Sequence, residues 1–178
     1  SKEDFAKVQD FLIDYKGLFV MTRSVRSYPR SSAANVLGYI GEISGSQLSR
    51  DSSNYYVQGD YVGHSGIEAY YEPELRGKKG VKYKLVNVRG IEKGAFKNGD
   101  LDTLSMPGEN LQSTIDLNLQ LYGEYLMEGK RGSVVAIEPK TGEILSIISA
   151  PSYDPNVLTG AKFGENYEVL NKDPDKPL

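Results

Sequence analysis

The sequence predicts an α+β fold with mixed, largely antiparallel strands, and three observations support this prediction. Residues 132–138 and 143–149 are short runs rich in β-branched residues, and a Pro-Lys-Thr-Gly turn at 139–142 separates them. This pattern is typical of a β-hairpin. Apolar residues at 116–127 recur at helical spacing, which predicts a helix. Residues 81–85 alternate between apolar side chains and lysines, as an exposed strand does.

The composition excludes several classes of protein. The 178 residues carry a net charge of −3, which offers no electrostatic footprint for nucleic acid. No apolar run reaches the roughly 18 residues of a membrane span, and there is no basic-then-apolar leader. We therefore expect a soluble segment, with any export signal or anchor outside it. The absence of cysteine excludes a disulfide framework and agrees with an oxidising envelope compartment.

The first 60 residues predict short elements. Ser1 and Asp4 resemble a capping box for a helix whose apolar residues recur from Phe5 to Tyr15, and Gly17 can end that helix. The elements expected next are a strand at 18–26 broken by Tyr28-Pro29, a short helix at 31–38, an extended piece at 39–43 and a short helix near Gln47.

Residues 65–76 predict a helix with an interruption. Ser65 and Glu68 have the spacing of a capping box, and Glu72 and Arg76 have the spacing of an exposed ion pair worth about 0.3–0.5 kcal/mol. Pro73 should kink the helix or start a new turn. The apolar residues that this helix would present are Ile67, Tyr71 and Leu75.

The second half contains clearer boundaries. Asn98-Gly99 is a hairpin-turn signal. Asp116 is the expected N-cap of the helix to Met127, and Gly129 is its stop. Apolar residues lie on two faces of this helix, which predicts that it is buried over much of its circumference. Its interior Gly123 costs about 1 kcal/mol relative to Ala, unless a neighbouring backbone must approach closely. The polar tail at 160–178 predicts a turn of helix at 167–170.

Several motifs follow one another in a fixed order along nearly the whole chain. They are R-x-x-R-x-Y-P at 23–29, N-V-L-G-Y-I-G at 35–41, G-x-x-G-x-E at 63–68 with Tyr71-Glu72 and Leu75-Arg76-Gly77, the Pro107–Asp116 run, the hairpin with S-x-P-S-Y-D-P-N at 149–156, and Asn171–Leu178. In this order they resemble class B penicillin-binding proteins of the cell-elongation type. Pro73 departs from that family's usual pattern.

The resemblance implies a division of the chain and a function for its parent. Residues 1–108 would be most of a pedestal (dimerisation) module, and 109–178 the start of a transpeptidase domain. The parent would be a periplasmic D,D-transpeptidase, anchored by an upstream membrane helix, that cross-links peptidoglycan by acyl transfer from D-Ala-D-Ala stem peptides. β-Lactams would acylate its serine. A membrane glycan polymerase and an elongation scaffold protein would be its partners, and no cofactor is implied.

The catalytic residues of that family are not expected in this segment. Penicillin-reactive enzymes need S-x-x-K, and no serine here has a lysine three residues later. The K-T-G at 140–142 lies in the predicted hairpin turn, and the S-x-N at 52–54 lies in a polar loop. We interpret both as structural. The resemblance places the reactive serine shortly after Leu178, so we predict no catalytic, cofactor or metal residue here and no activity for the segment alone.

Other candidate residues also have a structural interpretation. His64 lacks cysteine or histidine partners for a metal site, so we favour a surface or helix-entry role, with Asp60 and Glu68 as the neighbours that keep a catalytic role open. Asp100, Asp102 and Glu109 lack the spacing of a calcium loop, and we expect them to be solvated. The arginines expected to pair with buried acids such as Glu68, rather than to form a partner surface, are Arg23, Arg26, Arg76 and Arg89.

Two hypotheses from other classes remain open. The segment could be a stand-alone extracytoplasmic binding or scaffold module without activity, or an unrelated adhesion domain. In every case the hairpin at 133–149 is apolar on both faces, so we expect it to pair with another copy or to pack against the helix from Asp116.

Overall fold

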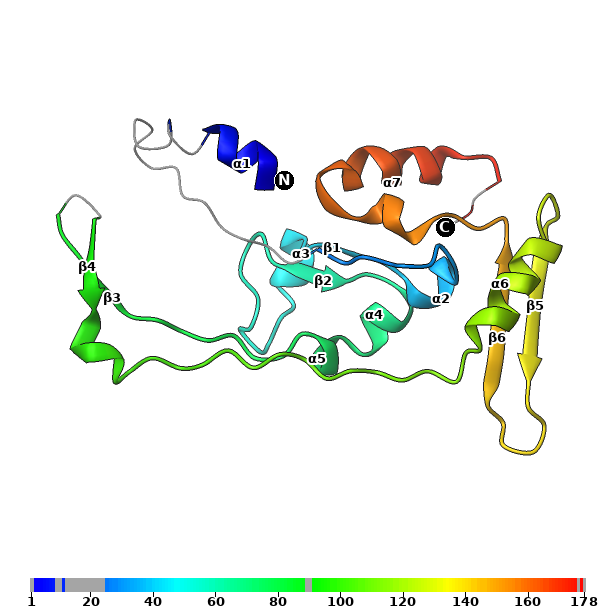
Figure 1. The fold of residues 1–178 in the computed structure, drawn as a ribbon, viewed down its shortest axis with the longest axis horizontal. Coiled ribbons are helices and arrows are strands. Elements are labelled where there is room, and N and C mark those ends of the chain that lie inside the picture. Colours follow the sequence, from blue (N-terminus) through cyan, green and yellow to red (C-terminus); the bar gives the residue numbers. More distant parts are fainter. Residues whose placement is uncertain (1, 9–10, 12–24, 89–90, 176, 178) are drawn as a thin grey trace.

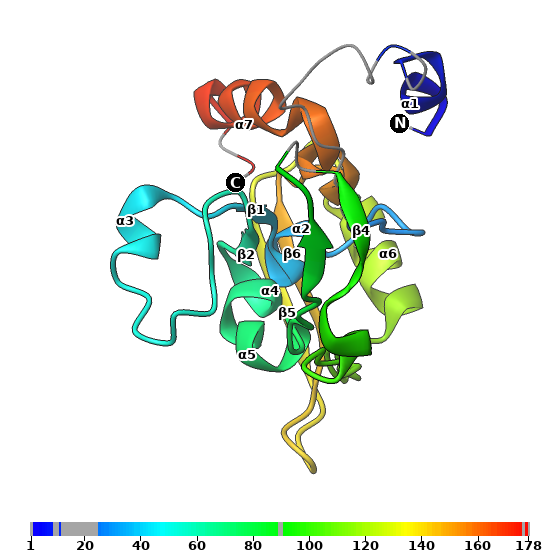
Figure 2. The same cartoon turned by 90° about the vertical axis from the view of Figure 1, so that its left-hand side faces the viewer.

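The computed structural model describes residues 2–8, 11, 25–88, 91–175 and 177. A central module carries an extended arm at one end and a helix–hairpin unit at the other (Figure 1). Seen from the arm end, α3 lies on one side of the molecule and α6 on the other (Figure 2). Each of the three described sheets is a two-stranded antiparallel pair. The predicted α+β class with antiparallel strands is confirmed.

The central module is built on the pair β1 (Ile40–Glu42) and β2 (Tyr61–Gly63), in which Ile40 lies opposite Gly63. The short helices around it are α2 (Ala34–Leu37), α3 (Gly45–Leu48), α4 (Gly66–Tyr70) and α5 (Glu72–Leu75). These elements match the predictions for 31–43, for a helix near Gln47 and for an interruption at Pro73, which occupies the first turn of α5.

Two glycines let α2 and α4 meet. Gly38 has φ 78°, and a β-carbon there would lie 1.9 Å from the Ser65 carbonyl oxygen. Gly66 has φ 59°, and a β-carbon there would lie 2.5 Å from the Val36 carbonyl oxygen. Only glycine fits positions that combine a positive φ with such backbone contact.

The arm consists of two strands that run out and back between residues 78 and 106. β3 (Lys84–Val86) pairs with β4 (Glu92–Ala95), and bridges at Lys78–Met106 and Val81–Thr103 continue the ladder. The prediction that Asn98-Gly99 connects two hairpin strands is wrong. It lies in the turn η2 (Phe96–Gly99) on the returning strand, and the reversal lies between Asn87 and Ile91, where the Asn87 N–H donates to the Ile91 carbonyl at 3.0 Å.

The helix–hairpin unit consists of α6 (Leu117–Leu126), β5 (Gly132–Ile137) and β6 (Ile144–Ala150). The Asp116 carboxylate accepts from the Asn118 and Leu119 N–H groups, so the predicted N-cap is confirmed. α6 packs on β6, as predicted for the hairpin. A β-carbon at Gly123 would lie 2.1 Å from the Ile148 Cδ1 atom, so a side chain, and not a backbone, makes the close approach there.

The prediction that α6 is buried over much of its circumference is wrong. Among its residues only Gln120 is buried, and its exposed apolar side chains are Leu117, Leu119, Tyr122, Tyr125 and Leu126. The described apolar core is correspondingly small, namely Ala34, Ile43, Ile148 and Leu158.

The two ends of the chain complete the structure. α1 (Lys2–Val8) is the described start of the predicted first helix, whose remainder lies outside the described residues, as does most of the predicted strand at 18–26. After β6 come η3 (Pro155–Leu158), η4 (Gly160–Lys162) and α7 (Phe163–Lys172), which is longer than the helical turn predicted at 167–170. Among the described residues, every helix is too short or too polar to span a bilayer.

Candidate functional site

The joint between the central module and the helix–hairpin unit begins with a network around Gln120 and Ser146, two of the four buried polar side chains of the described residues. Gln120 on α6 has no exposed surface. Its amide donates to the Ile147 carbonyl at 2.7 Å and accepts from the Ile147 N–H at 2.9 Å and the Ser146 hydroxyl at 3.0 Å. A fourth bond, to the Glu124 carboxylate at 2.9 Å, satisfies the whole amide. The side chain therefore acts as a strand partner along the edge of β6.

Glu124 extends this network into the central module. The same Oε1 atom accepts from the Ala33 backbone N–H at 2.7 Å. Ala33 has φ 56°, a left-handed conformation, at the N-cap of α2. One carboxylate therefore joins the start of α2 to α6. The Asp116 N–H adds a bond to the Leu145 carbonyl at 2.9 Å, so α6 is fixed at its start as well.

A second link joins residues that are 128 positions apart. The Tyr28 N–H donates to Asn156 Oδ1 at 3.0 Å, and Asn156 Nδ2 donates to the Tyr28 carbonyl at 3.0 Å. Asp154 orients Asn156 by accepting from its backbone and side-chain N–H groups. Partial burial acts to raise the pKa of Asp154, but these hydrogen bonds outweigh it and leave the pKa below its usual value. The S-Y-D-P-N motif therefore clamps the segment before α2.

An aromatic cluster forms a third link, between β1–β2 and α7. The Tyr39 ring stacks on His64 at 5.5 Å and lies 5.7 Å from both Phe163 and Tyr167. Burial, and then the hydrogen bond with Tyr167, raise the pKa of Tyr39 to about 12. His64 thus lies in a packed aromatic environment at the end of β2. Its predicted neighbours are engaged elsewhere, because Glu68 binds Arg26 and Asp60 binds Lys79.

Charged groups hold the central module together. Arg26 Nε and Nη2 bind the two oxygens of Glu68 at 2.8 and 2.9 Å, and Glu68 is only 8% exposed. The predicted pairing of an arginine with buried Glu68 is confirmed for Arg26, whereas Arg23 and Arg89 lie outside the described residues. The predicted Ser65–Glu68 capping box is wrong, since the Ser65 side chain makes no cap bond. The Glu68 carboxylate binds Arg26 instead.

The predicted Glu72–Arg76 ion pair is also wrong. Glu72 accepts from the Tyr56 hydroxyl at 2.6 Å and from the Gly63 N–H at 2.8 Å. The Arg76 guanidinium lies 4.1 Å above the centre of the Tyr55 ring, a cation–π arrangement. Both side chains therefore bind across the fold instead of along the helix.

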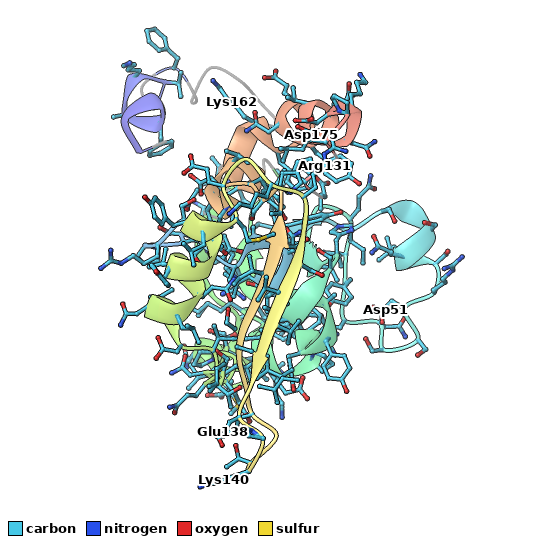
Figure 3. All side chains as sticks on the ribbon, turned by 90° about the vertical axis from the view of Figure 1, so that its right-hand side faces the viewer. Asp51, Arg131, Glu138, Lys140, Lys162 and Asp175 are labelled. Carbon is cyan, nitrogen blue, oxygen red and sulfur yellow. The ribbon has the colours of Figure 1, made fainter. Side chains whose placement is uncertain are left out.

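The motifs that resemble catalytic sequences lie apart from this joint. Lys140 is at the tip of the β5–β6 hairpin, together with Glu138 (Figure 3). Thr141 donates to Glu143 at 2.9 Å, within the turn. Ser53 and Asn54 belong to a loop that Asp51 organises by accepting from the Ser53, Tyr55 and Tyr56 N–H groups. The prediction that neither motif is catalytic stays a prediction.

The remaining candidates form neither a metal site nor an enclosed cleft in the described ranges. No group of three or more His, Cys, Asp or Glu side chains there could hold a metal ion. Of the acidic loop residues, Asp100 and Glu109 are exposed, and Asp102 accepts from the Tyr83 N–H at 2.9 Å. An open pocket of about 450 Å³ lies between the end of α6 and the end of β6. At its mouth Arg131 pairs with Asp175 (Figure 3).

Comparisons with known proteins agree with this architecture. Residues 1–113 match the penicillin-binding protein dimerisation domain family. The chain is 35% identical over 170 residues to the peptidoglycan D,D-transpeptidase MrdA of Escherichia coli K12, a match that covers 92% of this chain and 26% of that protein. It is 33% identical over 182 residues to penicillin-binding protein 3 of Bacillus subtilis, covering 99% of this chain and 25% of that protein. The chain thus spans about a quarter of the length of these relatives.

Solved structures show the same fold. Penicillin-binding protein 2 of Helicobacter pylori superposes with a TM-score of 0.71 at 31% identity, over 97% of this chain and 33% of that chain. The same protein in complex with MreC gives a TM-score of 0.73 at 30% identity, over 97% and 32%. A chain of a peptidoglycan synthase complex gives 0.68 at 29% identity, over 100% and 33%.

Proposed function

We propose, from the premise that the chain belongs to the penicillin-binding protein dimerisation-domain family, that it is the non-catalytic support of a peptidoglycan D,D-transpeptidase. The joint carries this proposal. Glu124 on α6 binds the Ala33 N–H of the central module, and Asn156, which follows β6, binds the Tyr28 backbone. Such bonds fix the orientation of one unit on the other, which is what a support that positions a catalytic domain requires.

The division into a pedestal at 1–108 and the start of a transpeptidase domain at 109–178 is part of this proposal. The family match ends at residue 113, and the Asp116 N-cap opens the helix–hairpin unit. Gly108 packs against the end of α5, where a β-carbon would lie 2.0 Å from the Leu75 carbonyl oxygen. The Glu109 N–H also donates to the Glu74 carbonyl at 2.9 Å, so this contact with α5 lies at the proposed boundary.

The activity belongs to the parent protein. The curated relative MrdA is named as a peptidoglycan D,D-transpeptidase, and we assign the same reaction, acyl transfer from D-Ala-D-Ala stem peptides through a serine that β-lactams acylate, to the parent of this chain. The S-x-x-K motif is missing from the sequence, so this chain alone is inactive. We assign the parent to the periplasmic side of the cytoplasmic membrane, with a membrane helix in the parent as its anchor.

Partners follow from the same comparisons. The Helicobacter pylori relative is solved with MreC, and another relative within a peptidoglycan synthase complex. A scaffold protein and a glycan polymerase are therefore the partners that we assign to this chain, with the central module as the contacting part.

The test compares labelling with cross-linking. A fluorescent penicillin should label the parent and leave this chain dark. In the parent, Glu124→Ala should leave penicillin labelling intact and lower cross-linking of glycan made by the partner polymerase, whereas the exposed Glu128→Ala should lower neither. Labelling of this chain, or equal cross-linking by both variants, would refute the proposal. A native product of this size in cell extracts would favour the stand-alone scaffold hypothesis.

A further inference from the structure

The segment before α2 contains two unfavourable features next to each other. Ser32 is only 4% exposed, and its hydroxyl has no hydrogen-bond partner within the described residues. A buried hydroxyl without a partner costs free energy, because it has lost its bonds to water. The next residue, Ala33, has φ 56° and ψ 29°, a left-handed conformation that is unfavourable for alanine. Such costs persist only where other contacts impose them.

The contact that imposes these costs comes from α6, which lies beside α2 at the end of the central module (Figure 1). The Glu124 carboxylate accepts from the Ala33 N–H at 2.7 Å, and this is the one hydrogen bond between α6 and the α2 segment in the described ranges. It is charge-assisted, so it is among the stronger hydrogen bonds of the chain. A few residues earlier, Asn156 holds the Tyr28 backbone. The helix–hairpin unit and the segment that follows it therefore hold residues 28–33 at both ends.

The sequence offers this segment a second conformation. In the structure α2 starts after Ala33, whose side chain cannot cap it, and the Asn35 N–H has no partner among the described residues. With ordinary helical angles at Ala33, Ser32 becomes the N-cap of α2, and its hydroxyl can accept from the Ala34 or Asn35 N–H, as serine N-caps do. This change removes both costs. Because α2 is held against α4, the change of φ at Ala33 turns the preceding peptide, and the bond to Glu124 breaks.

We propose that Ser32 and Ala33 form a two-state latch between the central module and the helix–hairpin unit. In the latched state Glu124 holds Ala33 in its left-handed conformation. In the released state Ser32 caps α2, and α6 no longer binds it. The two costs of the latched state oppose one charge-assisted bond, so the two states are close in free energy. A partner that contacts α2 more favourably in one state shifts the population toward that state.

The surroundings of α2 leave room for this change. The helix has only four residues, Ala34–Leu37, and so short a helix is marginal on its own. An open hollow of about 350 Å³ lies between α2 and β6, with Asn35 on one side and Ile147 on the other. Gln120 keeps α6 on β6 in both states, so release frees one unit from the other without unfolding either. The latch rests on the joint of the proposed function, but a joint with a single rigid state would refute the latch and leave the support function standing.

The first experiment releases the latch and follows single amides of the whole chain by hydrogen exchange. Glu124→Gln keeps the volume of the side chain but removes its charge, so the Ala33 amide should lose protection by about tenfold. The Ala34 or Asn35 amide should gain protection at the same time, because the serine hydroxyl now caps α2. Glu128→Gln, at an exposed site after α6, should change none of these amides. A loss at Ala33 without a gain at either neighbour would mean that a single state has loosened, and would overturn the proposal.

The second experiment shifts the latch the other way. Ser32→Ala removes the unbonded hydroxyl from the latched state and the cap from the released state, so protection of the Ala33 amide should rise about tenfold. Ser44 provides the matched control, because its hydroxyl already caps α3 by accepting from the Gln47 N–H at 3.3 Å. Ser44→Ala should therefore lower protection at Gln47. If Ser32→Ala also lowered protection, the hydroxyl would stabilise the observed state, and the latch would be refuted.

A third variant tests the backbone strain itself. Ala33→Gly makes the left-handed conformation favourable, so the amide of residue 33 should gain about tenfold in protection. Ala34→Gly, one residue further on and inside the helix, should instead lower the protection of α2. Unchanged protection in Ala33→Gly would show that this position stores no strain for the latch to release. Circular dichroism of each variant establishes that the chain is folded.

Discussion

The arm and the β5–β6 hairpin have the same two-stranded antiparallel topology, but the rest of the chain supports them differently. α6 covers one face of β6, where Ile148 and Ser146 are 4% and 1% exposed. In the part of the chain that the structure describes, no α-helix packs on either face of the arm, and the arm's apolar side chains from Val81 to Met106 are exposed. A two-stranded pair on its own is marginally stable. The hairpin therefore depends on its helix, whereas the described residues give the arm no such support.

The hairpin itself is only half covered. Val134, Val135 and Ile137 on β5 are 45%, 52% and 55% exposed. Gln120 and the Asp116 N–H bind the outer edge of β6 at Ile147 and Leu145. Because alternate residues of a strand point their N–H and C=O groups to opposite edges, the outer edge of β5 is the one available for another strand. Under the proposed function, that strand belongs to the parent's transpeptidase domain.

The largest loss of stability is expected from a change in the central module, which lies between the arm and the β5–β6 hairpin. Gly38→Ala should lower the free energy of unfolding by more than about 4 kcal/mol, because the new β-carbon meets a carbonyl at a backbone conformation reserved for glycine. Gly160→Ala, at φ 71° with open space around it, should cost about 1 kcal/mol. Urea unfolding measures both. Similar costs would show that the α2–α4 crossing can relax.

Substitutions on the covered and the open side of the hairpin should also differ in their cost to stability, by nearly as much as the two glycine substitutions. Ile148→Ala leaves a cavity under α6 and should cost about 3 kcal/mol, whereas Val135→Ala on the open strand should cost less than about 1 kcal/mol. Chemical denaturation of the two variants gives the ratio. If the two losses were equal, the helix would not be what stabilises this hairpin.

The polar contacts between α6 and β6 should contribute less to stability than the apolar contact at Ile148. Gln120→Leu keeps the volume but leaves the Ile147 backbone groups and the Ser146 hydroxyl without their partner, which should cost about 2 kcal/mol. Gln112→Leu, at an exposed site before α6, is the control and should be neutral. Hydrogen exchange should quicken at the Ile147 amide in the first variant only. Unchanged exchange would mean that water replaces the side chain.

The smallest effect is a pH dependence that comes from two partly buried tyrosines, Tyr39 of the aromatic cluster and Tyr56, whose hydroxyl donates to Glu72. The folded pKa values of Tyr39 and Tyr56 are raised to about 12, chiefly by burial. A raised folded pKa contributes stability that is complete below the unfolded value near 10 and is lost as the pH rises to about 12. Thermal unfolding between pH 9 and pH 12 should therefore show a fall that Tyr39→Phe with Tyr56→Phe reduces. An identical fall in the double variant would assign it to other groups.

Local signals alone determined several elements of this protein. The β-branched runs around a Pro-Lys-Thr-Gly turn specify β5 and β6, Asp116 starts α6, and Pro73 separates α4 from α5. Each of these elements depends on interactions between residues that are close together in the sequence. The local sequence is therefore enough to predict them. The order of motifs also identified the family, to which residues 1–113 belong.

The tertiary structure decided which partner each polar side chain takes and which apolar face is covered. Glu68 and Glu72 both had a local partner at helical spacing, but Arg26, Tyr56 and Gly63 bind them across the fold. An exposed local pair is worth only a few tenths of a kcal/mol, and a partly buried, charge-assisted bond is worth more. In the same way α6 is apolar on two faces, yet among the described residues only the face against β6 is covered. The spacing of residues along the chain does not show which distant residues come close in the fold. It therefore cannot predict which partner a polar side chain binds or which apolar face is covered.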